Sequence, residues 1–96
     1  MHYTPPFRIT YRYDCNFKEY ADTIEEAVEI GLKKHPESMI CVHGEATYNG
    51  YTQEAHVGIY AKDAEGKSKG EIMELFDQKI ENYIACRVRT GLWGIV

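Results

Sequence analysis

Apolar and polar residues alternate on both sides of Asn49-Gly50, over residues 39–48 and 51–60. Asn and Gly accept the positive φ angles that a two-residue hairpin turn requires, so the pair predicts a tight antiparallel hairpin. Because strand side chains alternate between faces, the turn also fixes which residues share a face. One face is predicted to be apolar, with Ile40, Val42, Ala46, Ala55, Val57 and Ile59. The other is predicted to carry Met39, Cys41, His43, Glu45, Thr47, Thr52, Glu54, His56 and Tyr60.

Apolar residues also recur at a regular spacing in other segments. Residues 7–13 alternate between apolar or aromatic and polar positions, which predicts a half-buried strand with Arg8 and Arg12 facing outward. Residues 23–34, and about fifteen residues that follow Ser68, have apolar positions at helical spacing, and each stretch begins with a capping-box pair. The tail, residues 87–96, has the apolar content of a closing strand.

The predicted order is therefore strand, helix, strand, strand, helix, strand. Right-handed crossovers place both helices on one face of a four-stranded antiparallel sheet, which is the ferredoxin-like βαββαβ arrangement of an α+β fold. One alternative stays open, because residues 17–20 could form an extra strand and give two hairpin-plus-helix units in series. The chain has no repeat or linker, so residues 1–96 are expected to form a single domain.

Composition and charge narrow the function classes. Fifteen acidic and eleven basic residues give a net charge of −4, which argues against broad binding to nucleic acid or to an anionic membrane. No apolar run approaches the ~20 residues of a membrane helix, and residues 1–8 lack the order of a secretion signal, so we expect a cytoplasmic protein. Cys15, Cys41 and Cys86 have no Cys-x-x-Cys spacing and are expected to be free thiols.

The arginines form the first candidate site. All four fall in the first and last predicted strands: Arg8, Arg12, Arg87 and Arg89. These strands are neighbours in a ferredoxin-like sheet, so the arginines would share its uncovered face. Arginine can hold a carboxylate or phosphate with two parallel hydrogen bonds, which makes the cluster a candidate site for a small anionic ligand or an acidic partner. The alternative is that these outward positions are simply solvated.

The second candidate site is a histidine pair. The hairpin register places His43 opposite His56, at a position where facing side chains are closest. Together with Cys41, Glu45 or Glu54, the two imidazoles could hold zinc, the one cofactor that the sequence suggests. No ligand-spacing signature supports this metal site, so a structural polar pair is the default interpretation. Catalysis by Cys41 with either histidine is a weaker hypothesis.

Tyrosines supply the third set of candidate contacts. Exposed tyrosines are enriched at protein interfaces, and Tyr48 and Tyr51 at the hairpin tip and Tyr60 on the open face are candidates for such contacts. The outward aromatic residues that stack RNA bases in RNA-recognition motifs are missing from residues 7–13, so RNA binding is not expected.

The expected function is therefore a non-enzymatic binding module that docks onto a protein partner, or onto itself as a dimer, through the open sheet face and the hairpin. In size and charge the chain is similar to the small inhibitors that phages encode against host systems. The alternative is a small-molecule, anion- or metal-binding protein that uses the arginines or the histidine pair. Enzyme activity is the third hypothesis.

Overall fold

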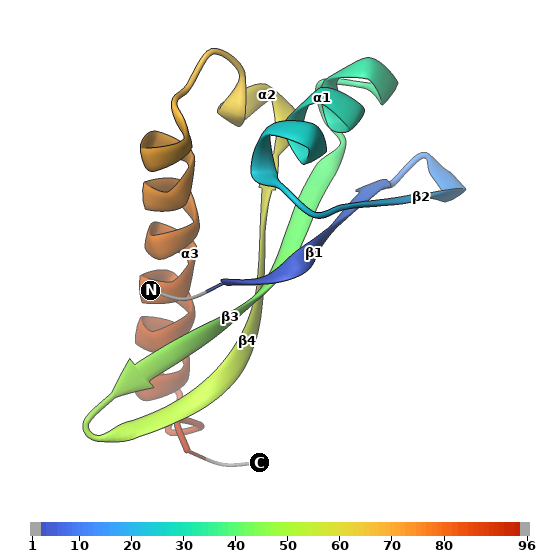
Figure 1. The fold of residues 1–96 in the computed structure, drawn as a ribbon. Coiled ribbons are helices and arrows are strands. Elements are labelled where there is room, and N and C mark those ends of the chain that lie inside the picture. The colour runs from blue at the N-terminus through green and yellow to red at the C-terminus, as the bar shows by residue number, and fades with distance from the viewer. Residues whose placement is uncertain (1–2, 95–96) are drawn as a thin grey trace.

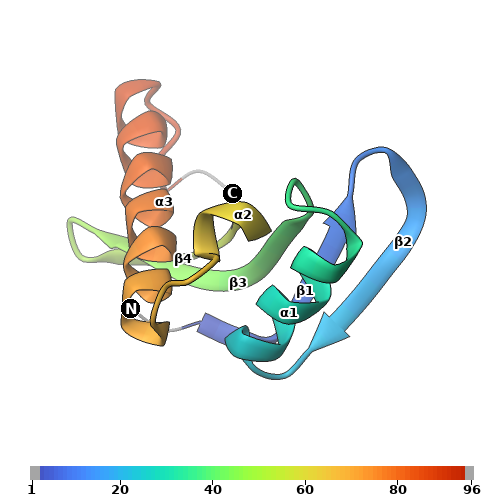
Figure 2. The ribbon, with the colours of Figure 1, turned by 90° about the horizontal axis from the view of Figure 1, so that it is seen from above.

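The computed structural model describes residues 3–94, which form one antiparallel sheet and three helices (Figure 1). The elements in chain order are β1 (Tyr3–Tyr11), β2 (Asp14–Ala21), α1 (Ile24–Lys34), β3 (Met39–Tyr48), β4 (Tyr51–Tyr60), α2 (Ala61–Ala64) and α3 (Lys69–Arg89). The strand order across the sheet is β2-β1-β3-β4. Helix α1 packs over β1 and α3 over β3 and β4, on the same face of the sheet (Figures 1 and 2).

The α+β class and the four-stranded antiparallel sheet are confirmed, but the predicted βαββαβ order is wrong. Residues 14–21 form β2, which pairs with β1, so the chain consists of two hairpin-plus-helix units in series. This is the arrangement that the sequence left open as an alternative. Strand β2 occupies the sheet edge beside β1, where the prediction placed the closing strand.

The predicted closing strand is not formed within the described residues, because residues 87–89 belong to helix α3 and residues 90–94 form turns. Arg87 and Arg89 are the last turn of α3, because residues 71–89 contain no glycine or proline that would end the helix. The helix ends in a Schellman motif: Gly91 has φ +73, its N–H bonds the carbonyl of Val88, and the N–H of Leu92 bonds the carbonyl of Arg87. Residues 95–96, which the prediction placed in the same strand, lie outside the described residues.

The β3–β4 hairpin has the predicted turn and register. Asn49 and Gly50 both have positive φ, 53° and 80°, and His43 pairs with His56. The residues predicted for the apolar face are all buried: Ile40, Val42, Ala46, Ala55, Val57 and Ile59. The face prediction is therefore confirmed.

Apolar stripes on two helices complete the core. Helix α1 contributes Ile24 and Ala27, while α3 contributes Ile72, Phe76 and Ile80, and all five side chains are buried against the sheet. Burying one large apolar side chain stabilises a fold by about 1.5–3 kcal/mol. These contacts hold both helices on one sheet face.

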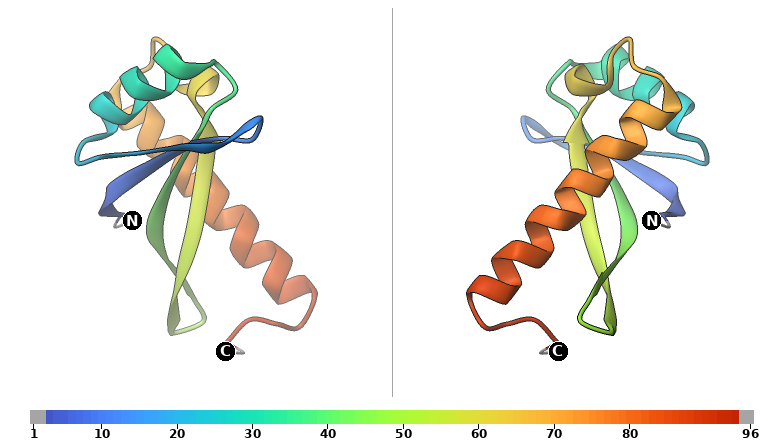
Figure 3. Two further views of the ribbon diagram at one scale, coloured as in Figure 1. Left: turned by 90° about the vertical axis from the view of Figure 1, so that its right-hand side faces the viewer. Right: turned by 90° about the vertical axis from the view of Figure 1, so that its left-hand side faces the viewer.

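A bulge bends β1 where it crosses β3. The β1–β3 register shifts between Thr4 and Arg8, across Pro5 and Pro6, which have no N–H to donate to the ladder. The sheet is strongly twisted, so that β1 and β2 cross β3 and β4 steeply (Figure 3). After the bulge, Arg8 pairs with Cys41 of β3. The bulge thus sets the position of Arg8 on the sheet.

Gly44 of β3 has no room for a side chain. A Cβ atom there would lie 3.0 Å from Cε1 of Tyr3 and 3.1 Å from Cδ1 of Ile80. We predict that Gly44→Val lowers the free energy of unfolding, measured by urea denaturation, by about 1–3 kcal/mol through overpacking. In the control Gly70→Ala, the nearest atom, Oγ of Ser68, is 4.0 Å away, so stability should be unchanged or higher by up to about 1 kcal/mol. Equal effects of the two substitutions would contradict this packing.

Tyr3 links β1 to α3, because its hydroxyl donates a hydrogen bond to Oδ1 of Asp77 at 2.5 Å. Burial first, and then this bond to Asp77, raise the pKa of Tyr3 above its ordinary value. The folded state therefore holds this proton more tightly than the unfolded state does. Its contribution to stability is complete below the unfolded pKa of about 10 and is lost as the pH rises above that value.

We predict that the stability advantage of the wild type over Tyr3→Phe shrinks as the pH rises above about 10. Urea denaturation of both proteins at neutral and alkaline pH measures this advantage. An advantage that stays constant with pH would show that the Tyr3 proton is not linked to folding.

Candidate functional site

The candidate site lies on the sheet face opposite α1 and α3. In the left view of Figure 3, β3 and β4 lie in front of α3, so this face has no helical cover in the part of the chain that the structure describes. We call it the open face. Its charged, histidine, tyrosine and cysteine side chains include Arg8, Lys18, Tyr20, Cys41, His43, Glu45, Glu54, His56 and Tyr60.

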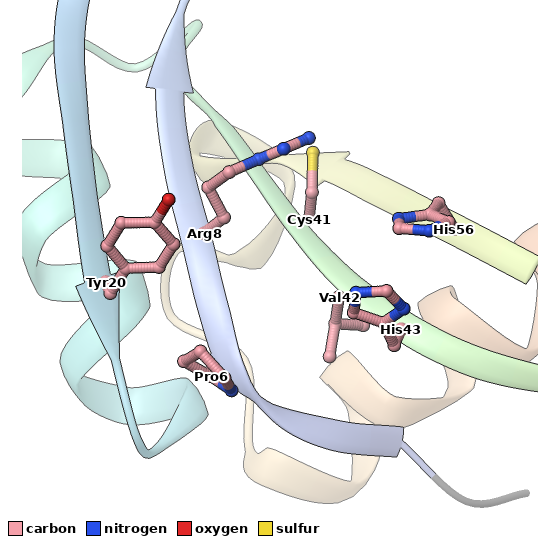
Figure 4. Close-up of a pocket in the computed structure, with 7 residues that line it drawn as sticks. All are labelled: Pro6, Arg8, Tyr20, Cys41, Val42, His43 and His56. Atoms are coloured by element: carbon pink, nitrogen blue, oxygen red, sulfur yellow. The ribbon is translucent and has the colours of Figure 1, made fainter.

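The open face is hollowed by a pocket of about 210 Å³, shown in Figure 4. It is lined by Pro6, Arg8, Tyr20, Cys41, Val42, His43 and His56. All four strands contribute, since β2 supplies Tyr20, β4 supplies His56, and the bulged part of β1 supplies Pro6 and Arg8. We call this the open-face pocket.

The two histidines are cross-strand neighbours, as predicted. Their ring centroids are 4.0 Å apart, the rings are tilted by 56°, and both residues are exposed. Within residues 3–94, no group of three or more His, Cys, Asp or Glu side chains is arranged to hold a metal ion. A zinc site needs at least three protein ligands in its usual forms, so this geometry supplies His43 and His56 but no third donor. Zinc binding by the pair stays a prediction.

Cys41 lies beside Arg8 on the open face. Burial raises the pKa of the Cys41 thiol, and a hydrogen bond from Arg8 offsets only part of that effect. Nucleophilic cysteines have the opposite property, a lowered pKa that gives thiolate at neutral pH. Among the described residues Arg8 forms no ion pair with a carboxylate, so its charge is not neutralised locally.

The structure separates the four arginines that the sequence analysis grouped. Arg8 is on the open face, and Arg12 lies in the turn between β1 and β2, where it donates to the hydroxyl of Tyr13. Arg87 and Arg89 lie at the end of α3, on the covered side of the sheet. The predicted arginine cluster is therefore wrong, because it depended on a closing strand beside β1.

The hairpin tyrosines pack against Trp93. Tyr48 and Tyr51 are 46% and 41% exposed, and each packs edge-on against Trp93, with ring centroids 5.9 and 6.1 Å apart. The indole Nε1 of Trp93 also donates to the carbonyl of Tyr48 at 3.1 Å. Tyr60 lies at the far end of β4, with Nζ of Lys62 5.4 Å from its ring centroid. The three tyrosines thus do not form one patch.

Two features of the surface were missed from the sequence. Tyr20 belongs to the open-face pocket, and the signal for it was the possible extra strand over residues 17–20. The second feature is an apolar groove of about 540 Å³ between the hairpin and α3, lined mainly by Tyr48, Ile84, Ala85 and Val88. It was missed because residues 87–96 were assigned to a strand.

Comparison of this chain with models of protein families, with curated proteins and with solved structures found no match. None of the helices formed by residues 3–94 combines the length and the apolarity that a membrane crossing requires.

The raised pKa of Cys41 gives a direct chemical prediction. At neutral pH, iodoacetamide should alkylate Cys41 several-fold more slowly than the exposed Cys15 and Cys86, because burial raises the pKa of Cys41 and limits access to its sulfur. Arg8→Gln should slow Cys41 further, because the bond from Arg8 favours the thiolate. Peptide mass spectrometry over time measures all three rates. Alkylation of Cys41 as fast as that of Cys15 would contradict this environment.

Proposed function

We propose that this chain is a non-enzymatic binding module that docks a protein partner on its open face. The observation that carries the proposal is the uncovered four-stranded face with exposed aromatic and charged side chains. Tyr20 is 54% exposed there, beside the exposed Arg8. Tyrosine and arginine are enriched at protein interfaces relative to the rest of the surface, so the composition of this face fits docking.

The chemistry of the pocket supports binding over catalysis. Arg8, His43 and His56 can hold a group by charge and hydrogen bonds. The thiol beside them is biased toward its protonated form, which is a poor nucleophile. A reaction of the cysteine–histidine type needs an activated thiolate in hydrogen-bond contact with its base.

The charge layout of the open face favours a second copy of the chain as the partner. Along β3 the face presents three successive rows, Arg8 with Cys41, then His43 with His56, then Glu45 with Glu54. Two copies stacked face to face, with a two-fold axis along the histidine row, would set the Arg8 row of each copy against the glutamate row of the other. Self-complementarity of this kind is what a two-fold interface requires.

A charge-swap experiment tests the proposal. We predict that wild-type protein self-associates in sedimentation velocity, and that Arg8→Glu or the double variant Glu45→Arg/Glu54→Arg weakens association by about tenfold or more. An equimolar mixture of the two variants should restore association, because opposite charges then face each other again. Lys79→Glu, on the exposed side of α3, is the matched control and should associate like the wild type.

If the wild type stays monomeric, the second-copy form of the proposal is wrong and the partner is a different protein. Capture from host extract then decides the matter, with wild type, Arg8→Glu and Lys79→Glu as baits. A partner retained by the wild type and by Lys79→Glu but lost with Arg8→Glu would support the open face as the docking surface. No self-association together with no such partner would overturn the proposed function.

A further inference from the structure

The open-face pocket gathers hydrogen-bond donors without a neutralising acid. Its described lining includes the guanidinium of Arg8, the hydroxyl of Tyr20 and the imidazoles of His43 and His56, and no carboxylate (Figure 4). Arg8 has five N–H donors, and its partner Cys41 is only a weak acceptor through sulfur. Donors gathered in this way fit an oxyanion, which supplies several acceptor oxygens and a charge opposite to that of Arg8.

We infer that this pocket binds a single oxyanion group, a carboxylate or a phosphate- or sulfate-like group, held by Arg8 together with His43 and His56. The volume of about 210 Å³ is below the roughly 300–1,000 Å³ of pockets that enclose a whole drug-sized ligand, so one charged group fits better than an entire nucleotide. This site goes beyond the proposed docking function and does not require a protein partner.

The histidine pair links anion binding to pH. Side chains of all four strands face the imidazoles or border them: Arg8 on β1, Tyr20 on β2, Cys41 and Glu45 on β3, and Glu54 on β4. With ring centroids 4.0 Å apart, two protonated imidazoles repel each other. A bound anion has the opposite charge to an imidazolium, so the protonated pair holds it more tightly than the neutral pair does. Histidine changes charge between about pH 5 and 8, so anion affinity should rise as the pH falls through that range.

Sulfate is the probe for this site, because its charge stays constant over the pH range in which histidine titrates. Sulfate replaces chloride at constant ionic strength, and the ring signals of His43 and His56 are followed by NMR. The titration is run at a protein concentration at which sedimentation shows monomers. We expect saturable binding at about pH 5.5 and affinity about tenfold weaker, or more, at about pH 8.

Three variants locate the binding. Arg8→Gln and His43→Gln/His56→Gln should each weaken sulfate binding about tenfold or more, because each removes charge-assisted hydrogen bonds. Lys18→Gln is the matched control, since it removes one exposed positive charge from the same face but lies outside the pocket lining. It should bind sulfate like the wild type. Thermal denaturation checks that every variant is folded, and Arg8→Lys replaces Arg8→Gln if the latter is not.

Three results would overturn the inference. One is the absence of saturable binding at about pH 5.5. Another is equal weakening by Arg8→Gln and Lys18→Gln, which would mean that sulfate senses only the general charge of the face. The third is an affinity that does not change with pH, because the imidazoles would then not be ligands. A monomeric protein that binds sulfate in the predicted way would overturn only the second-copy docking, so the two proposals fail separately.

Discussion

The structure depends most on the two-residue turn at Asn49-Gly50. Both residues have positive φ, a conformation that most side chains disfavour, and the turn fixes the register of twenty strand residues in β3 and β4. A slip of one residue would move every side chain of a strand to the other face. The turn therefore decides at once which residues fill the core and which are displayed on the open face, including His43 and His56.

The bulge in β1 is a second constraint, and it shapes the open face. Two prolines that cannot donate to the ladder shift the β1–β3 register, and Arg8 then lies beside Cys41 within the pocket. Both helices pack on the opposite face because their apolar stripes have only one apolar sheet face to cover. The open face and the face that packs the core are thus separated by the alternation of the strands.

The sequence predicted the parts of this arrangement that local rules determine. The hairpin turn, the buried face of β3 and β4, the His43–His56 pairing and the capped start of both long helices follow from φ preferences, strand period and capping. The strand order did not follow, because pairing of β1 with β2 depends on tertiary contacts that alternation alone does not specify. The strand predicted for residues 87–96 was wrong because Val88 suits either a strand or the end of a long helix. Helix formation is cooperative, and α3 extends through Val88 to Arg89. Because that strand is not formed, the predicted arginine cluster does not exist. Strand β2 supplies Tyr20 to the pocket.

The candidate site depends on His43 and His56 being cross-strand neighbours on a face open to solvent. NMR of the isolated chain tests it most directly, by combining nuclear Overhauser contacts between the two rings with the relaxation caused by a soluble paramagnetic agent. We expect a direct contact between the two rings and strong paramagnetic relaxation of both, with Ile40 and Val57 shielded. Rings without mutual contact, or rings shielded as well as Ile40, would contradict it.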